Sequence, residues 1–205
     1  MEDSKYIIGL TGNIATGKTR VRELLESLGA ATIDADELAH QLMAPGTRLW
    51  QRVVEAFGQG ILTPEGAINR AELARIVFSN AAELNRLEQM VHPAVVAEAF
   101  RRAQKALGKV VVIEAIKLVE AGMDAYCDEL WLVTCRPEQQ IDRLRKGRGW
   151  ARDQAERRMR AQTGIEEKLS LADVVIDNSG EFIQTEGKVR EQWERVKKKV
   201  AGGRR

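Results

Sequence analysis

The residues between Gly12 and Thr19 have the types and spacing of a phosphate-binding loop. The segment fits G-x-x-x-x-G-K-[ST], after an apolar run and before a helical pattern. Its glycines let the backbone curl so that successive N–H groups point at phosphate oxygens, while the lysine adds a positive charge and the threonine hydroxyl can ligate Mg²⁺. The alternative is a tight strand-to-helix turn with a chance lysine. The predicted nucleotide-binding residues are Gly12, Asn13, Ile14, Ala15, Thr16, Gly17, Lys18 and Thr19, with Lys18 also catalytic and Thr19 also the metal ligand.

Two carboxylates, Asp34 and Asp36, follow a second apolar run. In an open α/β sheet, ligands gather beyond the carboxyl ends of the strands, so one or both carboxylates can face a phosphoryl group there. A carboxylate in that place can orient an attacking hydroxyl and accept its proton. The alternative is that one of them caps the helix that starts near Glu37.

The segment from Arg136 to Arg160 is the most basic part of the chain. It carries nine Lys and Arg residues against four Asp and Glu residues, a local balance of +5. Gly147 and Gly149 are predicted to divide it into two helical pieces, a mobile hairpin that closes over polyphosphate and supplies an arginine. The alternatives are a solvated helix face or an RNA-binding patch; interleaved aromatic residues would favour RNA, and only Trp150 is present.

Five short apolar runs alternate with helical patterns, which predicts an α/β fold with a mainly parallel sheet. The stretch between the second and third runs is too long for a simple crossover, so residues 36–107 are predicted to form a helical subdomain. Within it, His92 before Pro93 indicates a helix break or turn. The five predicted strands are Tyr6 to Leu10, Ala31 to Asp34, Val110 to Ile113, Leu130 to Thr134 and Val174 to Ile176.

Composition describes an ordinary soluble protein of 205 residues, 44% hydrophobic and 30% charged, with a net charge of +2. Such a small net charge does not by itself indicate that the protein binds nucleic acid or an anionic membrane. No apolar stretch is long enough to cross a bilayer, and the acidic start from Met1 to Asp3 is unlike a signal peptide, so we expect a cytoplasmic protein. Cys127 and Cys135 are expected to be reduced, structural thiols, and the lysines at 197–199 a solvated helix end.

Beyond the phosphate loop, an ordered set of motifs resembles the dephospho-CoA kinase family over nearly the whole chain. The resemblance implies an enzyme that uses ATP and Mg²⁺ to phosphorylate the ribose 3′-hydroxyl of dephospho-CoA, the last step of coenzyme A synthesis. The motifs are Gly9 to Gly12, Asp34-Ala35-Asp36 with His40, Gly66 to Arg70 with Leu73 and Val77-Phe78, Leu84-Asn85, Val91-His92-Pro93, Arg158 with Gln162, and Lys168 leading to Ala172 to Gly180.

The same resemblance implies roles for individual residues. Asp36 would be the catalytic base, Arg143 or Arg148 would face the ATP phosphates, and the loop with Asn178 and Gly180 would lie by the adenine. A contact of His40 with the Asp36 carboxylate or the substrate, and a packing role for His40, both stay open. His92 is expected to be structural or to contact the substrate.

The resemblance also implies a single P-loop kinase domain over residues 1–205, with a three-layer fold and a five-stranded parallel sheet. Its nucleotide-binding core would comprise residues 1–39, 108–135 and 166–205. Residues 40–107 would be a helical CoA-binding insertion, and residues 136–165 a helical lid.

The chain departs from the family pattern in two places. The family usually carries Pro-Leu-Leu-x-x-Glu after the third strand, where residues 115–120 read Ala-Ile-Lys-Leu-Val-Glu, and Val96 stands where an arginine is usual. Our hypothesis is that Lys117 binds a phosphate or pyrophosphate of the substrate in place of that arginine; the alternative is a lysine that extends from a strand end into solvent. Glu114 is a weaker candidate for a Mg²⁺-associated acid, or else a partner for Lys117.

Two other functions share some of these features. A P-loop kinase that acts on another nucleotide or nucleoside would have the same loop and lid. A GTP-dependent switch would need N-K-x-D and D-x-x-G elements, and the sequence contains neither; its late loop reads Asp177-Asn178-Ser179-Gly180.

Overall fold

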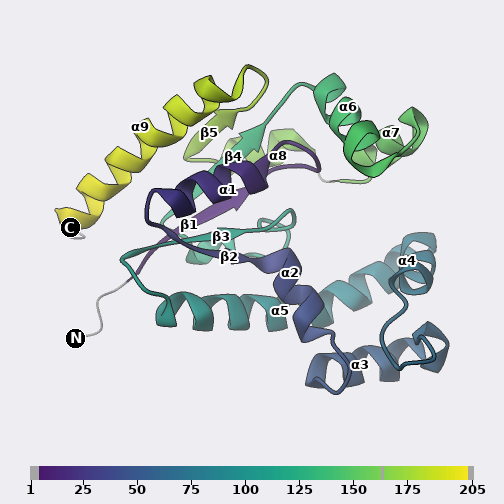
Figure 1. The fold of residues 1–205 in the computed structure, drawn as a ribbon. Coiled ribbons are helices and arrows are strands. Elements are labelled where there is room, and N and C mark those ends of the chain that lie inside the picture. Colours follow the sequence, from purple (N-terminus) through teal and green to yellow (C-terminus); the bar gives the residue numbers. More distant parts are fainter. Residues whose placement is uncertain (1–4, 163, 203–205) are drawn as a thin grey trace. The chain divides into compact units, whose positions relative to one another are not determined.

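A five-stranded sheet in the order β2-β3-β1-β4-β5 is the centre of the fold (Figure 1). The structure, a computed structural model, describes residues 5–162 and 164–202; the acidic start of the chain lies outside them. β1 pairs in parallel with β3 and β4, and β4 with β5. The predicted α/β class and all five predicted strands are therefore confirmed. The strands are β1 (Tyr6–Thr11), β2 (Ala31–Asp34), β3 (Val110–Glu114), β4 (Glu129–Thr134) and β5 (Val174–Asp177).

Helices connect the strands, and most of them lie between β2 and β3 or between β4 and β5. Pro93 lies inside α5, so the predicted break at His92 and Pro93 is wrong: packing and the remaining hydrogen bonds carry the helix through the proline. The helices are α1 (Lys18–Ser27), α2 (Ala35–Leu42), α3 (Arg48–Phe57), α4 (Arg70–Ser79), α5 (Ala81–Lys105), α6 (Pro137–Arg148), α7 (Arg152–Arg160), α8 (Ile165–Leu171) and α9 (Phe182–Ala201), with short 3₁₀ turns at Gln59–Ile61 and Asp124–Tyr126.

The chain divides into two compact units, Met1–Ile33 with Ala103–Arg205, and Asp34–Arg102. In the first unit, α1 and α9 cover one face of the sheet (Figure 1). Strand residues that alternate in sequence, such as Ile8 with Leu10 and Trp131 with Val133, point to this face and are buried. The helices contribute apolar side chains at helical spacing, namely Val21, Leu25, Val189, Trp193 and Val196.

The opposite face of the same sheet is also buried. Ile7, Val111, Ile113 and Leu132 are at most 5% exposed. Gly9 lies on this face, where an added Cβ would come within 3.1 Å of a Leu118 methyl group, so the segment after β3 packs directly on the strand. Strands that are apolar on both faces are typical of a parallel sheet between two covering layers.

The second unit is a helical subdomain with its own apolar core. Thr47 and Asn69 cap α3 and α4 by accepting hydrogen bonds from the N–H groups of Trp50 and Glu72. The Trp50 indole donates to the Gly66 carbonyl at 3.1 Å, which ties α3 to the turn at residues 63–66. The buried core residues are Leu49, Val53, Ile61, Leu73 and Val77.

None of the helices within the described part of the chain is long and apolar enough to span a bilayer.

Candidate active site

The segment between β1 and α1 has the backbone shape of a phosphate-binding loop. Gly12 and Gly17 have φ angles of 151° and 98°, a region that favours glycine. A Cβ added at Gly12 would lie 2.3 Å from the Val133 carbonyl oxygen, and one at Gly17 would lie 2.2 Å from Asn178 Nδ2. Both glycines are therefore required by geometry. Because α1 begins at Lys18, its first N–H groups and its dipole face the loop.

Lys18 and Thr19 lie at the start of α1. Lys18 is only 6% exposed, and its ammonium donates to the Asn13 carbonyl at 3.2 Å. The Thr19 hydroxyl donates to Glu114 Oε1 at 3.2 Å, and Arg22 Nε donates to Glu114 Oε2 at 2.7 Å. The end of β3 thus presents a buried carboxylate to the threonine. The hydroxyl and the carboxylate are hard oxygen groups, so this pair fits Mg²⁺.

Side chains distant in sequence hold the loop from outside. Arg143 Nη1 donates to the carbonyls of Ala15 and Thr16 at 3.1 and 2.9 Å, and its Nη2 donates to the Asn178 carbonyl at 3.0 Å. Asn178 Nδ2 donates to the Thr16 carbonyl at 2.8 Å, and Asn178 Oδ1 accepts from the Thr185 hydroxyl at 3.0 Å. The structure therefore brings Arg143 and Asn178 to the loop, where both bind its backbone.

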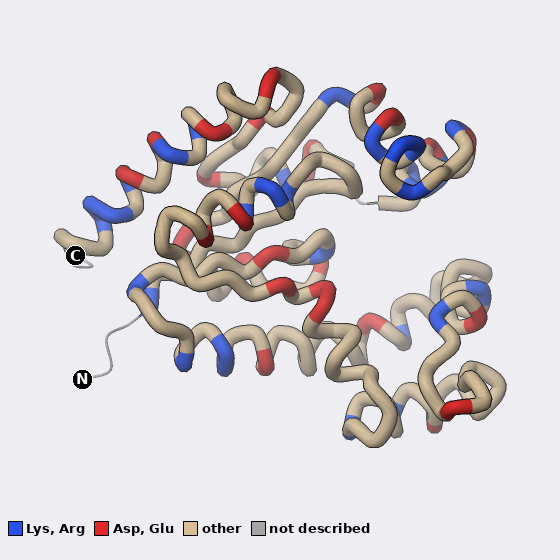
Figure 2. Tube along the Cα trace, in the orientation of Figure 1, with Lys and Arg blue, Asp and Glu red and all other residues tan. Residues whose placement is uncertain are grey.

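The basic segment is a pair of helices, α6 and α7, on which Lys and Arg positions outnumber Asp and Glu positions (Figure 2). The two predicted helical pieces are therefore present; the glycine that separates them is Gly149, with a φ of 67°, whereas Gly147 lies inside α6. Arg148 lies at the end of α6 with its guanidinium 5.1 Å from the centre of the Trp150 ring. Gly180 is exposed, in the loop between β5 and α9.

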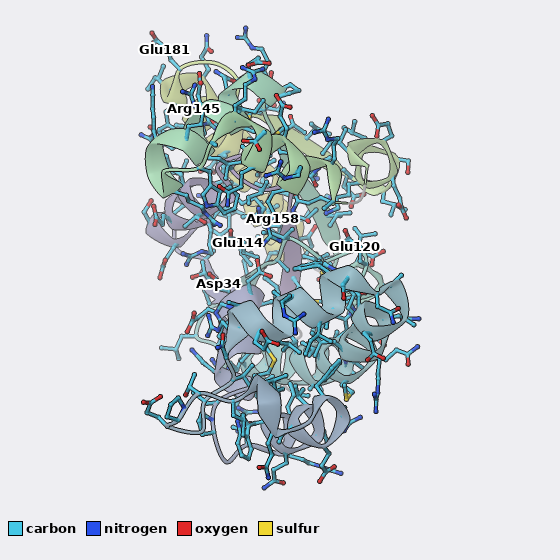
Figure 3. All side chains as sticks on the ribbon, turned by 90° about the vertical axis from the view of Figure 1, so that its right-hand side faces the viewer. Asp34, Glu114, Glu120, Arg145, Arg158 and Glu181 are labelled. Atoms are coloured by element: carbon cyan, nitrogen blue, oxygen red, sulfur yellow. The ribbon has the colours of Figure 1, made fainter. Side chains whose placement is uncertain are left out.

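A buried lysine supports the segment after β3, which carries Lys117. Lys168 on α8 has no exposed surface, and its ammonium donates to the Ile116 carbonyl at 2.7 Å. It also forms an ion pair with Glu120 Oε1 at 3.2 Å. Glu120 is labelled in Figure 3. The Thr11 hydroxyl donates to the same carbonyl at 3.3 Å. Lys117 itself is exposed on this fixed segment.

In the second unit, the two predicted carboxylates occupy different positions at the start of α2. Asp34 is the N-cap of α2, since its Oδ1 accepts from the Glu37 N–H at 2.9 Å, and Asp36 lies in the first turn of that helix. The capping alternative is thus confirmed for Asp34. His40 Nδ1 lies 3.4 Å from Glu37 Oε2. His92 lies within α5 and is half-buried.

The two cysteines are thiols, as predicted. Burial, with a smaller contribution from Asp124, raises the pKa of Cys127 to about 12. Burial also raises the pKa of Cys135, beside the phosphate loop. Both side chains therefore stay protonated at neutral pH, which suits packing and not nucleophilic catalysis.

The dephospho-CoA kinase family model matches residues 6–184. The chain belongs to the dephospho-CoA kinase family. A dephospho-CoA kinase of Carboxydothermus hydrogenoformans is 43% identical over 182 residues, which cover 87% of this chain and 88% of that relative.

Two solved structures are similar over nearly the whole chain. A crystal structure of a Thermus thermophilus protein, TT1252, has a TM-score of 0.83 at 28% identity and covers 94% of this chain and 98% of its own. The dephospho-CoA kinase of Campylobacter jejuni has a TM-score of 0.70 at 25% identity and covers 95% and 98%. These likenesses agree with the fold predicted for a dephospho-CoA kinase.

Sequence reasoning missed two residues that shape this site. Gln140 and Arg22 each bind a site segment far away in the chain. Their only sequence signal is helical spacing: Gln140 precedes Arg143 by one turn, and Arg22 follows Thr19 by one turn, which puts each pair on one helix face. The partners themselves lie more than 90 residues away and could not be read from such spacing.

Proposed function

We propose that this chain transfers the γ-phosphoryl group of ATP to the ribose 3′-hydroxyl of dephospho-CoA, which gives coenzyme A and ADP. The observation that carries the proposal is the phosphate-binding loop, shaped by Gly12 and Gly17 and followed by Lys18 and Thr19, in a member of the dephospho-CoA kinase family. Relatives that carry this name are about as long as this chain, so its site is expected to serve the same reaction.

In the proposed reaction, the 3′-oxygen forms a bond to the γ-phosphorus while the bond from that phosphorus to the β,γ-bridging oxygen breaks. The loop N–H groups and Lys18 hold the phosphates and offset their charge. Asp36 accepts the proton of the hydroxyl; Asp34 is already engaged as a helix cap, which favours the second carboxylate of the pair. Arg143 and Arg148 remain the proposed lid arginines, and Asn178 and Gly180 the proposed adenine contacts.

The residues that would hold Mg²⁺ are Thr19 and, beside it, Glu114. The Thr19 hydroxyl is the proposed direct ligand, and the carboxylate 3.2 Å away orients it. When bound, Mg²⁺ neutralises charge on the β- and γ-phosphates. Arg22, which binds the other Glu114 oxygen, keeps that carboxylate in place.

The acceptor is proposed to contact His40, His92 and Lys117. We further propose that residues 40–107 form the CoA-binding insertion, that residues 136–165 form a lid which excludes water, and that residues 1–39, 108–135 and 166–205 form the nucleotide-binding core of a single kinase domain. The proposed location is the cytoplasm. No membrane or nucleic-acid partner is included in the proposal.

Acceptor-dependent ADP release is the direct test. With ATP and Mg²⁺, ADP should form when dephospho-CoA is added, and the product should have the mass of coenzyme A. Nucleoside monophosphates and nucleosides, added one at a time, test the alternative that another nucleotide or nucleoside is the acceptor. ADP release with one of these, and none with dephospho-CoA, would contradict the proposal. Replacing ATP by GTP tests whether the protein prefers ATP as the phosphoryl donor.

A further inference from the structure

The main chain of Ile14, in the phosphate loop, is held on both sides by glutamine side chains. Its N–H donates to Gln162 Oε1 at 2.8 Å, and its carbonyl accepts from Gln140 Nε2 at 2.7 Å. Gln140 lies on α6 and is only 7% exposed; Gln162 follows the end of α7. We call Gln140 and Gln162 the glutamine clasp. Neither residue has a role in the mechanism described above.

Because the peptide bonds are trans, these two hydrogen bonds also fix the direction of the neighbouring N–H and C=O groups of the loop. The C=O and N–H of a planar trans peptide point in opposite directions, and none of the described peptides is cis. When Gln140 binds the Ile14 carbonyl on the outside of the loop, the N–H of Ala15 must point to the inside. When Gln162 accepts from the Ile14 N–H, the Asn13 carbonyl must point away from Gln162. The Asn13 carbonyl is the group that accepts from the Lys18 ammonium at 3.2 Å.

The backbone at Ala15 needs such support. Its φ of 60° is the one positive φ at a non-glycine residue within the described ranges, and an L-residue adopts it only at a cost in free energy. The side chains of Ile14 and Ala15 pack against the apolar cluster of α6 and α7, which includes Ile141 and Leu144. The helix pair therefore holds the loop in a shape that its own residues do not favour.

We propose that Gln140 and Gln162 are positioning residues for the nucleotide. Gln140 orients the Ala15 N–H toward the inside of the loop. Gln162 orients the Asn13 carbonyl, which accepts a hydrogen bond from the Lys18 ammonium. They act through the loop and are not catalytic residues. The inference rests on the proposed function, because ATP, the phosphate donor of that function, is the ligand that the loop would bind.

Leucine at either clasp position removes the hydrogen bond and keeps a side chain of similar size. Both glutamines line a cavity of about 530 Å³, which leaves room for the branched side chain. We expect Gln140→Leu and Gln162→Leu each to weaken ATP binding about tenfold by calorimetry, equivalent to about 1.4 kcal/mol. The KM for dephospho-CoA should change less than about twofold, since the proposed acceptor contacts, His40, His92 and Lys117, lie outside the loop.

The matched control is Gln154→Leu, which changes an exposed glutamine on α7 and should leave ATP affinity unchanged. Thermal unfolding checks that each variant is folded. If Gln140→Leu does not fold, Gln140→Glu keeps the length and replaces the donor by a carboxylate, and the same loss of affinity is expected.

A second-site substitution separates positioning from direct contact with the nucleotide. Glycine adopts a positive φ without steric cost, so Ala15→Gly should recover most of the affinity lost in Gln140→Leu. A loss that Ala15→Gly leaves unchanged, or wild-type ATP affinity in both leucine variants, would overturn the inference. These outcomes are distinct from a failure of the proposed function, which would appear as absent turnover with dephospho-CoA in the wild-type protein that binds ATP.

Discussion

At the scale of single residues, glycine at position 17 satisfies two constraints at once. Its φ of 98° is unfavourable for other residues, and its Cα faces Asn178, whose amide would lie 2.2 Å from an added Cβ. Asn178 in turn binds the Thr16 carbonyl. A side chain at position 17 would therefore disturb both the loop and the asparagine that supports it.

For this reason Gly17→Ala should weaken ATP binding about a hundredfold, which corresponds to about 2.7 kcal/mol. Calorimetric titration with ATP measures the effect. Gly29→Ala is the control, because Gly29 has a similar φ of 105° and no heavy atom within 4 Å of an added Cβ. It should reduce the free energy of unfolding by about 1 kcal/mol and leave ATP affinity intact. Equal ATP affinity in both variants would show that the contact with Asn178 is unimportant.

A second prediction at this scale concerns Lys117. If its ammonium binds a phosphate of the acceptor, Lys117→Ala should raise the KM for dephospho-CoA about tenfold and leave the KM for ATP unchanged. Steady-state kinetics with each substrate varied gives both constants. Lys198→Ala removes an exposed lysine near the end of α9, outside the proposed CoA-binding insertion, as a control. An unchanged KM for dephospho-CoA would remove Lys117 from the proposed acceptor site.

At the scale of elements, one carboxylate anchors α9 to the sheet. Glu129 begins β4, is 3% exposed, and accepts from the Tyr6 hydroxyl at 2.8 Å and the Trp131 indole at 3.0 Å. Arg195 binds both of its oxygens, and Lys199 binds Oε1. The predicted solvated lysine run is exposed at all three positions, and the ammonium of Lys199 also has a buried partner, Glu129, that the sequence did not indicate.

Burial alone would raise the pKa of Glu129, but the hydrogen bonds from Arg195, Lys199, Trp131 and Tyr6 outweigh burial and lower the pKa to about 2. The unfolded chain has a glutamate pKa near ~4.3. The group therefore contributes about 3 kcal/mol to stability above pH ~4.3, and this contribution is lost as the pH falls toward 2.

Glu129→Gln should accordingly lower the free energy of unfolding at neutral pH by about 3 kcal/mol. Its stability should also fall less steeply between pH 5 and pH 2 than that of the wild type, and urea unfolding at several pH values measures both. Glu191→Gln, at an exposed residue paired with Lys188, should behave as the wild type. Parallel pH curves for wild type and Glu129→Gln would contradict this account of the anchor.

At the scale of the whole molecule, the groups that the proposed reaction needs belong to both compact units. The phosphate loop, Lys18 and Thr19 lie in the unit built on the sheet, and Asp36 lies in the helical unit. A substitution in the helical unit should therefore be able to reduce proton transfer without weakening nucleotide binding.

Asp36→Asn tests this separation. Loss of a general base should reduce turnover about a thousandfold, whereas ATP affinity should stay within about threefold of the wild type. Asp34→Asn is a matched control, because asparagine can also cap α2 and should leave turnover nearly unchanged. ADP release and calorimetry supply the two readouts. Wild-type turnover in Asp36→Asn, or an equal loss in Asp34→Asn, would contradict the assignment of the base.

The sequence by itself determined the phosphate loop, the five strands and the helical nature of residues 36–107. These depend on short-range patterns, such as glycine spacing and runs of β-branched residues, whose conformational preferences act within a few residues. It did not determine the course of α5, where tertiary packing overrides the local preference of Pro93 to end a helix.

Only the tertiary structure decided which side chains hold the loop. Gln140, Arg143 and Asn178 bind loop carbonyls across 126 to 162 residues of sequence. Each is a polar residue whose local pattern fits an exposed helix or loop equally well. Its partner is fixed when the sheet aligns β1, β4 and β5 in parallel, since that alignment brings the segments after these strands to the same edge.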